Sequence, residues 1–440
     1  MNSNLKLLRN TMTLGLGAAS AQLLGIMAVP VLAHVFDARD FGLFAIFFLG
    51  SQLLGTCFAA RYEQAIMVAE ERHIRPLTAL CVGLAAFSAL VGALVLAVFA
   101  HDLDLAFGAS LGLAWPMTCI TAFFVSLAVT FSMLASRRQN YRDVSVSRFC
   151  KAMIAILIQV ALGLTILPGA WGLIIGETIA AGLAAAILLS SRRWLYISDL
   201  RLNFFNRRSR QALLLVASRY HLFPKFGLPH FLINSLSGFT LIAIIGARFS
   251  SVEAGQYFMM QRIVMLPAGI ISAAISQVLF LEAHQQLKKA GRFDGVVFRV
   301  IVVQVTIGAI LLLTLLFFGA DLFSLVLGSQ WLPSGQLAEL FAPYVAVHLV
   351  LSSLAPVPVV AGQQKLALIL SVIQNVLFVG GFFVPAWLGM PLGSAVSTSI
   401  YISMPYMICL IVLFFVMSRT PGSFPIAGTN RFPSAEGLDL

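Results

Sequence analysis

The sequence predicts an all-α integral membrane protein with about twelve transmembrane helices, arranged as two six-helix bundles related by a parallel repeat. Of the 440 residues, 60% are hydrophobic and only 10% are charged, whereas about 25% of the residues in a soluble domain are usually charged. Apolar runs of about 20 residues recur along the chain. Each is long enough to cross the roughly 30 Å hydrocarbon core of a bilayer as a helix.

We expect twelve membrane spans, whose ends are approximate. They cover residues 11–35, 41–60, 76–100, 109–135, 144–168, 170–190, 226–247, 254–281, 296–318, 337–361, 364–388 and 391–416. The first run follows Lys6 and Arg9 and contains Ala19-Ser20-Ala21, as a cleaved signal peptide would. Because this run continues to about Val35 and a second span follows at once, an uncleaved first helix is better supported.

The positions of the basic residues predict how these helices are oriented. With the N-terminus in the cytoplasm, all but three of the 28 lysines and arginines fall on cytoplasmic segments. The exceptions are Arg39 and Arg248 on the opposite side and Arg262 within a span. Cytoplasmic loops of membrane proteins are enriched in Lys and Arg. The asymmetry therefore predicts an even number of helices with both termini in the cytoplasm.

A basic linker divides the predicted helices into two sets of six. In residues 191–225, arginines interleave with aromatic residues such as Trp194 and Phe204, which is typical of a segment on the inner leaflet. Such a pattern can also bind nucleic acid, but membrane spans flank the linker on both sides, which favours contact with lipid. We therefore expect bundles at 1–190 and 226–417, joined by the 191–225 linker, and a disordered cytoplasmic tail at 418–440.

The two predicted bundles share an internal repeat with an offset of 213 residues. The matching pairs include Phe36 and Phe249, Asp40 and Glu253, Gly42 and Gly255, Phe44 and Tyr257, and Gln64 and Gln277. An even number of helices in each half gives parallel repeats around a central cleft. One position departs from the repeat, because Arg262 stands where the first half has Leu49.

Arg262 is the main candidate for a binding residue. It lies inside an otherwise uncharged helix, on the same helical face as Gly255 and Gly269. A charge within a span costs roughly 2.5 to 3.5 kcal/mol on insertion scales, so it usually faces a partner or a wet cavity. Arg262 can therefore line a cavity, or it can snorkel to the outer headgroups or form a structural ion pair.

Several other polar residues are candidates for the same cavity. Glu177, the one acidic residue well inside a span, can pair with Arg262, titrate during transport, or accept hydrogen bonds from neighbouring helices. Amides spread over both halves, as a cleft for a hydroxyl-rich ligand requires, although a single amide more often joins two helices. Those assigned to the cavity are Gln22, Asn234, Gln261 and Gln277.

The sequence contains no recognisable catalytic or metal-binding motif. Its five cysteines form no CxxC pair and no Cys/His metal spacing, and we interpret all of them as packing residues. There is no phosphate-binding GxxxxGK, no nucleophile elbow and no HExxH. We therefore expect neither a cofactor nor a metal, and we do not expect an enzyme.

At the inner end of the second predicted span, Arg61-Tyr62-Glu63-Gln64 combines both charges with an aromatic residue. This segment fits either a local ion pair that ends the span or a gate. With Ala65-Ile66, it resembles the O-antigen and exopolysaccharide flippases of the multidrug/oligosaccharidyl-lipid/polysaccharide exporter superfamily. The second half is similar to the same family in Arg219-Tyr220, Ala254-Gly255, Gln261-Arg262, Ser276-Gln277-Val278 and Gly328-Ser329-Gln330-Trp331.

This resemblance implies a cleft between two bundles that opens alternately to each side of the bacterial inner membrane. Its substrate would be a polyprenyl-diphosphate-linked oligosaccharide, whose diphosphate Arg262 would bind. Arg9 and Arg61, with Glu63 and Gln64, would form a cytoplasmic gate. Such flippases often have several cationic residues in the cleft, whereas Arg262 is the one clear case in this sequence. That count argues against a strongly charged glycan.

Membrane lipids and, in the same pathway, a glycan polymerase and a chain-length regulator are the further partners that the resemblance implies. We expect no nucleic-acid partner, and the sequence is compatible with a monomer. Two other functions remain open. A multidrug antiporter of the same fold would favour acidic residues in its cleft. A membrane-embedded glycan polymerase or ligase would need a large outer loop, and the longest expected outer segment is about Gly319 to Gln336.

Overall fold

The computed structural model describes residues 20–108, 111–165, 169–190 and 207–419, and this part of the chain is helical without a β-strand. Ten of its helices are long and apolar enough to cross a membrane, and two shorter apolar helices cover Ser20–Val35 and Ser235–Arg248. Together they correspond one to one with the twelve expected spans. The prediction of an all-α, multi-pass membrane protein is therefore confirmed. The side of the membrane on which the termini lie stays a prediction.

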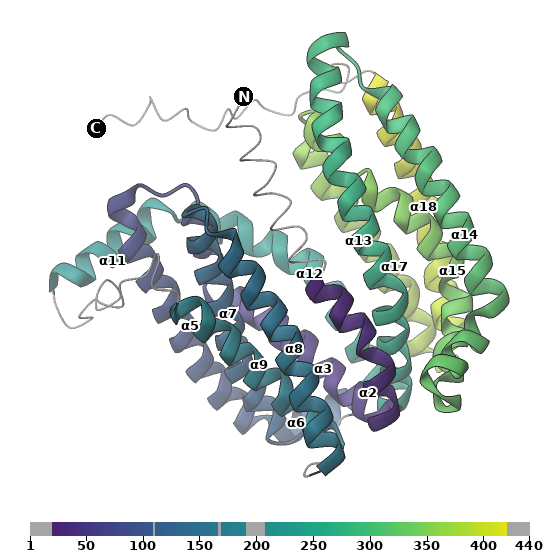
Figure 1. Cartoon of the computed structure of the whole chain (residues 1–440), viewed down its shortest axis with the longest axis horizontal. Helices are drawn as coiled ribbons and strands as arrows, with labels where there is room; N and C mark the ends of the chain where they lie inside the picture. The colour runs from purple at the N-terminus through teal and green to yellow at the C-terminus, as the bar shows by residue number, and fades with distance from the viewer. Residues whose placement is uncertain (1–19, 109–110, 166–168, 191–206, 420–440) are drawn as a thin grey trace. The chain divides into compact units, whose positions relative to one another are not determined.

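Figure 1 labels the elements in chain order. They are α2 (Val29–Val35), α3 (Ala38–Phe58), α4 (Tyr62–Ala65), α5 (Glu71–Val98), α6 (Ala100–Phe107), α7 (Ala114–Arg137), α8 (Tyr141–Thr165), α9 (Ala170–Ser190), α11 (Arg207–Arg219), η1 (Phe223–Gly227), α12 (Leu228–Arg248), α13 (Ser251–Ala290), α14 (Asp294–Leu327), η2 (Ser329–Trp331), α15 (Leu332–Ser353), α16 (Val357–Val360), α17 (Gln364–Trp387) and α18 (Leu392–Arg419). Arg9, residues 191–206 of the linker and residues 420–440 of the tail lie outside the described residues.

The expected outer segment is helical rather than a loop. The segment from about Gly319 to Gln336 is mostly helical, because α14 continues to Leu327 and α15 begins at Leu332, with the short helix η2 between them. Helices that project beyond the bilayer keep their backbone hydrogen bonds. No large outer loop remains among the described residues of this region.

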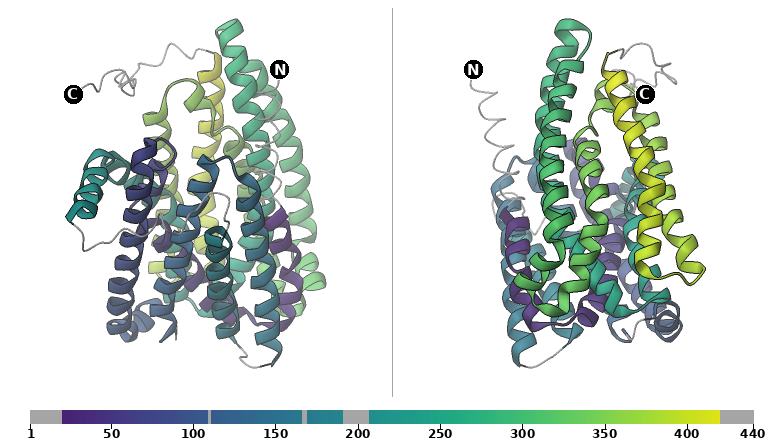
Figure 2. Two further views of the ribbon diagram at one scale, coloured as in Figure 1. Left: turned by 60° about the vertical axis from the view of Figure 1, so that its left-hand side comes forward. Right: turned by 90° about the vertical axis from the view of Figure 1, so that its right-hand side faces the viewer.

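The chain forms two compact units, which we describe separately. Unit 1 contains residues 1–266, 319–337 and 385–392, and unit 2 contains residues 267–318, 338–384 and 393–440. In unit 2, α14 and α18 run antiparallel, since the Phe293 N–H donates to the Ser418 carbonyl at 3.1 Å and Phe298 packs on Phe415. Figure 2 shows these long helices from two further sides.

Small residues bring the helices of unit 1 close together. A Cβ at Gly55 of α3 would collide with Val125 and with the Ala122 carbonyl of α7. A Cβ at Gly176 of α9 would collide with Gln159 of α8. Membrane helices often use small residues in this way, because helix association in lipid depends on close packing.

The internal repeat reappears in the way α3 crosses α13. A Cβ at Gly42 would overlap the Ser251 carbonyl, and a Cβ at Gly255 would overlap the Ala38 carbonyl. Ser251 and Gly255 lie 213 residues after Ala38 and Gly42. The contact is therefore reciprocal, as in an interface between two symmetry-related copies.

Matching helix caps precede this crossing. The Asp37 carboxylate accepts from the Asp40 N–H at 2.9 Å, and the Ser250 hydroxyl accepts from the Glu253 N–H at 3.1 Å. Both caps satisfy amides that the first turn of a helix leaves unpaired. We call the end of unit 1 that carries these caps the capped end. The predicted orientation places it on the periplasmic side.

Trp331 and Gln330 fix the end of α2 within unit 1. Both side chains donate to the Ala33 carbonyl, from Trp331 Nε1 at 3.1 Å and from Gln330 Nε2 at 2.8 Å. That carbonyl lies in the last turn of α2, where carbonyls lack partners in their own helix. Phe41 packs edge-on against the Trp331 ring at 5.4 Å. The Gly328-Ser329-Gln330-Trp331 segment is therefore explained by packing.

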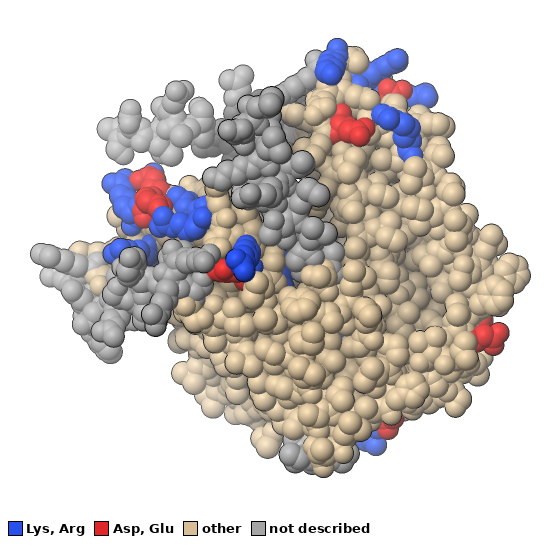
Figure 3. Space-filling view, viewed as in Figure 1, with Lys and Arg blue, Asp and Glu red and all other residues tan. Residues whose placement is uncertain are grey.

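Charged side chains lie mainly near the helix ends. On the face that Figure 3 shows, most Lys, Arg, Asp and Glu lie toward the edges, one group lies inside the outline beside the grey residues, and the remaining broad surface is uncharged. An uncharged belt of this kind suits a hydrocarbon environment.

Candidate functional site: charges inside unit 1

Arg262 lies well inside the longest helix. It follows Ser251, the first residue of α13, by eleven positions, which places it about 16 Å along the helix axis at about 1.5 Å per residue. Its side chain is half-buried, and the neighbouring Met259 and Met260 are fully buried. Among the described residues, no carboxylate lies within ion-pair distance of Arg262, but Glu177 is close enough to act on it electrostatically.

Glu177 forms its ion pair with a residue that the sequence did not single out. Its Oε1 atom lies 2.7 Å from Nζ of Lys151 on α8, and the Glu177 side chain is only 7% exposed. The count of basic residues places Lys151 on a cytoplasmic segment, although it falls within the expected span 144–168 and, in the structure, within the apolar helix α8. It lies ten residues after Tyr141, the start of α8, or about 15 Å along the axis. Unit 1 therefore contains a second intramembrane cation.

A pattern in α8 could have revealed Lys151. Ser147, Ala155 and Gln159 are buried, and Ser147 and Gln159 bond to α9. Lys151 continues their spacing of four residues on the same helical face. Because Lys151 stands near the basic inner end of the predicted span, the charge count assigned it to the loop. The four-residue spacing along the helix, and not the distance from the loop, indicates that Lys151 faces α9.

Two hydrogen bonds hold α8 against α9 on either side of this ion pair. The Ser147 hydroxyl donates to the Ala184 carbonyl at 2.9 Å, and Gln159 Nε2 donates to the Leu173 carbonyl at 3.0 Å. Both are buried bonds between helices. The frame they make keeps Lys151 and Glu177 facing each other, and with Arg262 the group holds two positive charges and one negative charge.

The structure gives less information about the four amides that we predicted to line the cavity. Gln261 is half-buried and donates to the Tyr257 hydroxyl at 2.8 Å on its own helix. Gln22 and Gln277 are exposed, and the side chain of Asn234 lies outside the described residues. No described contact joins Gln22 or Gln277 to Arg262. Their assignment to a cavity stays a prediction.

The predicted gate residues form a compact polar cluster at the other end of α3. Arg61 Nη1 lies 3.4 Å from Oε1 of Glu63, and the Arg61 guanidinium lies over the Phe231 ring of α12 at 5.0 Å. Glu63 is 1% exposed, and burial raises the pKa of its carboxyl above the usual value. The expected local ion pair is present, while a role in gating stays a prediction.

The same region connects α5 with α11. Arg219 Nη2 lies 2.7 Å from Oε1 of Glu70, and the Tyr220 hydroxyl lies 3.2 Å from Nδ1 of His73. The Tyr62 hydroxyl donates to the Ala217 carbonyl at 3.0 Å. These contacts bring together the Arg61-Tyr62 and Arg219-Tyr220 segments, which are far apart in the sequence. Among the described residues, no group of His, Cys, Asp and Glu is arranged to hold a metal ion.

Solved structures of membrane transporters share this fold. The structure entitled lipid II flippase MurJ, in an inward closed conformation, is 13% identical over 92% of this chain and 90% of that chain, with a TM-score of 0.68. An inward-facing multidrug resistance MATE family transporter of the MOP superfamily is 12% identical over 92% of this chain and 96% of that chain, with a TM-score of 0.56. A MOP superfamily transporter from Pyrococcus furiosus is 13% identical over 94% of each chain, with a TM-score of 0.55.

At these identities the likeness establishes a transporter fold and nothing finer. No curated protein matches the sequence at a significant level. A family model described as polysaccharide biosynthesis protein matches residues 31–336, which is more than half of the chain. The chain belongs to the polysaccharide biosynthesis protein family.

Proposed function

We propose that this protein moves a polyprenyl-diphosphate-linked oligosaccharide from the cytoplasmic to the periplasmic leaflet of the bacterial inner membrane by alternating access. The product would serve the biosynthesis of a surface polysaccharide such as O-antigen, exopolysaccharide or capsule. The observation that carries the proposal is the group of Arg262, Lys151 and Glu177 inside unit 1. The family and the shared transporter fold support the same function.

The charge group suits a diphosphate. A diphosphate cannot enter hydrocarbon without losing the hydration of its negative charges, which is costly. Arg262 offers a planar guanidinium that can donate two parallel hydrogen bonds to phosphate oxygens, and Lys151 offers a compact point charge. The lipid tail need not enter the protein, since it can stay in the bilayer beside it.

Glu177 explains how these cations are tolerated when no substrate is bound. Its carboxylate pairs with Lys151 at 2.7 Å and acts on Arg262 at longer range. An incoming diphosphate would compete with Glu177 for both cations. Because the competing carboxylate is held by the protein, the site favours a ligand with more than one negative charge over a single carboxylate.

Alternating access also requires that one end of the transporter close while the site is loaded from the other. The reciprocal crossing of Gly42 and Gly255 and the Trp331 bond to Ala33 join the two halves of the sequence at the capped end. These contacts lie near helix ends. They are suited to separate when the transporter opens in that direction.

The proposal is tested by replacing Arg262 in cells that make the surface glycan. Arg262→Ala should leave protein abundance normal and abolish surface glycan, while Arg262→Lys should retain part of it because a point charge replaces a two-bond contact. Arg248→Ala, which removes an arginine from the end of α12, is the matched control and should have little effect. Normal glycan in cells with Arg262→Ala would overturn the proposed role.

A multidrug antiporter is the second candidate, and the fold likeness to MATE transporters favours it. An exporter of cations needs a carboxylate that is free to bind them, whereas Glu177 is already paired with Lys151. Overexpression that raises resistance to cationic drugs without changing surface glycan would favour this alternative.

A further inference from the structure

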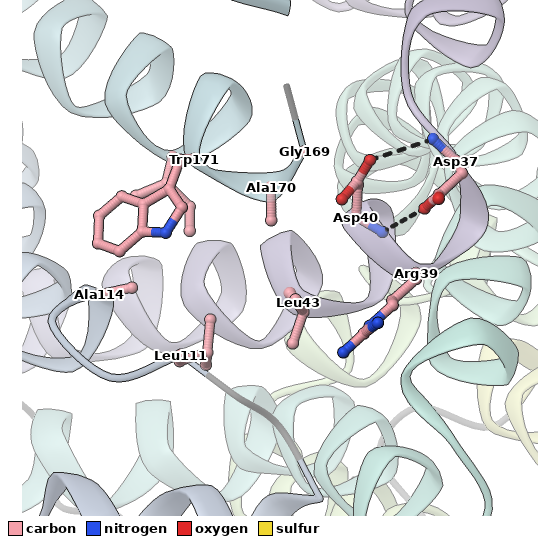
Figure 4. Close-up of a pocket in the computed structure, with 10 residues that line it drawn as sticks. Asp37, Arg39, Asp40, Leu43, Leu111, Ala114, Gly169, Ala170 and Trp171 are labelled. Atoms are coloured by element: carbon pink, nitrogen blue, oxygen red, sulfur yellow. Dashed lines mark hydrogen bonds between the residues drawn. The ribbon is translucent and has the colours of Figure 1, made fainter. Parts of the chain in front are cut away.

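We propose that a cavity at the capped end of unit 1 binds one sugar ring of the transported glycan. This inference rests on the proposed function, because it assumes a lipid-linked glycan as substrate. The cavity has a volume of about 330 Å³ and lies between the start of α3, the start of α9 and the residues before α7 (Figure 4). That volume is at the lower end of the roughly 300–1,000 Å³ usual for ligand pockets, so it suits a single ring rather than an oligosaccharide.

The lining has the two kinds of surface that a sugar needs. The Trp171 ring forms one wall, while Asp37, Arg39 and Asp40 stand together on the opposite side (Figure 4). Between them Leu43 forms an apolar floor. A sugar ring has an apolar face of C–H groups, which an aromatic ring can cover, and a rim of hydroxyls that both donate and accept hydrogen bonds.

The carboxylates are held in place by the backbone. Asp37 Oδ1 accepts from the Asp40 N–H at 2.9 Å, and Asp40 Oδ2 accepts from the Asp37 N–H at 3.3 Å. The Ala170 N–H of α9 also donates to Asp40. A carboxylate has about four acceptor positions, so acceptor capacity remains for hydroxyl groups, and the backbone bonds fix its direction.

The helix cap alone does not explain this set of residues. The repeat builds the equivalent cap of α13 from Ser250 and Glu253, where Asp37 is replaced by a neutral hydroxyl. The position of Arg39 is taken by Val252 in the same register. One half of the molecule therefore caps its helix without the additional acid and without the arginine, so the charged rim of the cavity is specific to the first half.

The charge of the rim argues against the anionic part of the substrate as the ligand of this cavity. Two carboxylates and one guanidinium give a net charge of −1, which opposes a diphosphate but suits an uncharged ring with many hydroxyls. Trp171 precedes Glu177 on α9 by six residues, or about 9 Å along the axis. A diphosphate near Arg262 and Lys151 and a sugar in this cavity would thus be separated along α9 by a distance that a short glycan can bridge.

The test uses the full-length protein in lipid nanodiscs and saturation-transfer NMR, with methyl glycosides of glucose, galactose, mannose and N-acetylglucosamine as probes. Wild type should show saturable binding of at least one glycoside. Trp171→Ala should weaken that binding at least fivefold, and Asp37→Asn, which keeps an oxygen acceptor for the cap, at least twofold. Trp387→Ala removes a tryptophan that is 63% exposed and should change nothing.

No saturable binding in wild type, or equal binding in wild type and Trp171→Ala, would overturn the sugar site. The diphosphate role of Arg262 and the sugar site beside Trp171 can be disproved independently of each other. Arg262→Ala should bind the glycosides as wild type does, because the cavity does not include it. If cells with Arg262→Ala export glycan normally while Trp171→Ala loses glycoside binding, the diphosphate role is wrong and the sugar site stands.

Discussion

At the scale of single residues, the least expected feature is the buried Lys151–Glu177 pair. A buried ion pair is weak support for stability, because desolvation of both charges offsets their attraction. In the proposed function, the pair keeps the Lys151 cation inside the bilayer until a diphosphate, which carries more negative charge than the Glu177 carboxylate, binds to it. The pair also corrects the expectation of a single intramembrane cation, and with it the argument against a charged substrate.

Removal of Lys151 alone should be more harmful than removal of the pair. Lys151→Met leaves Glu177 buried without a partner, which costs about 3–5 kcal/mol where both charges are fully buried, and less here because Lys151 is 29% exposed. The double variant Lys151→Met/Glu177→Leu should recover most of the lost melting temperature in detergent. The control is Arg148→Met, which changes an exposed cation on the same helix. A double variant less stable than Lys151→Met would contradict this account.

Glu63 should make stability depend on pH. Its folded-state pKa is raised by burial above the usual 4.5, so the protonated form is favoured by folding. This contribution is fully present below the unfolded pKa and is lost as pH rises through the raised folded pKa. Glu63→Gln, which stays neutral, should therefore lose less melting temperature than wild type over that rise. An identical pH dependence in both proteins would show that Glu63 does not titrate there.

At the scale of elements, the internal repeat accounts for the close crossing of α3 and α13. Each helix contributes the glycine that the repeat duplicates, so the same small residue permits close contact from both sides. The sequence offset of 213 residues predicted the equivalence of Gly42 and Gly255, but it did not predict that they would touch. That contact depends on how α3 and α13 cross, which the sequence offset does not contain.

A methyl group at this crossing should be costly. Gly42→Ala places a Cβ against the Ser251 carbonyl, so the helices must separate, and overpacking typically costs about 1–3 kcal/mol. Gly238→Ala in α12 meets open space and should be neutral or stabilising by up to about 1 kcal/mol, since alanine favours helix. The comparison is made by thermal unfolding in nanodiscs. Equal melting temperatures for the two variants would mean that the crossing of α3 and α13 accommodates a methyl group at Gly42.

The helices themselves were largely predictable, and the reason is physical. A span needs about 20 apolar residues whatever surrounds it, so each span could be predicted from its own residues. The helical structure of 319–336 could not be predicted in this way, because helices extend beyond the apolar core. The burial of Lys151 could not be predicted either, because a lysine is tolerated inside a span only where a partner from another helix exists. The cavity beside Trp171 was also missed, since it joins the starts of α3 and α9, which lie more than 100 residues apart in the sequence.

At the scale of the whole molecule, the twelve helices and the uneven distribution of basic residues make one joint prediction about topology. An even number of spans places both termini on one side, and the positive-inside rule makes that side cytoplasmic. The loop before α9 and the starts of α3 and α13 would then face the periplasm. With this topology the proposed sugar site lies on the outer side, where it would receive the glycan after the glycan has crossed the membrane.

Reporter fusions test this topology directly. Green fluorescent protein fused after Arg419 should fluoresce, and alkaline phosphatase fused there should be inactive, because the end of α18 is expected in the cytoplasm. Alkaline phosphatase inserted at Gly169, just before α9, should be active. A fusion after Ser190, at the other end of α9, is the matched control and should show the opposite pattern. Active phosphatase after Arg419 would reverse the orientation, and the cavity beside Trp171 would then receive sugar before transport instead of after it.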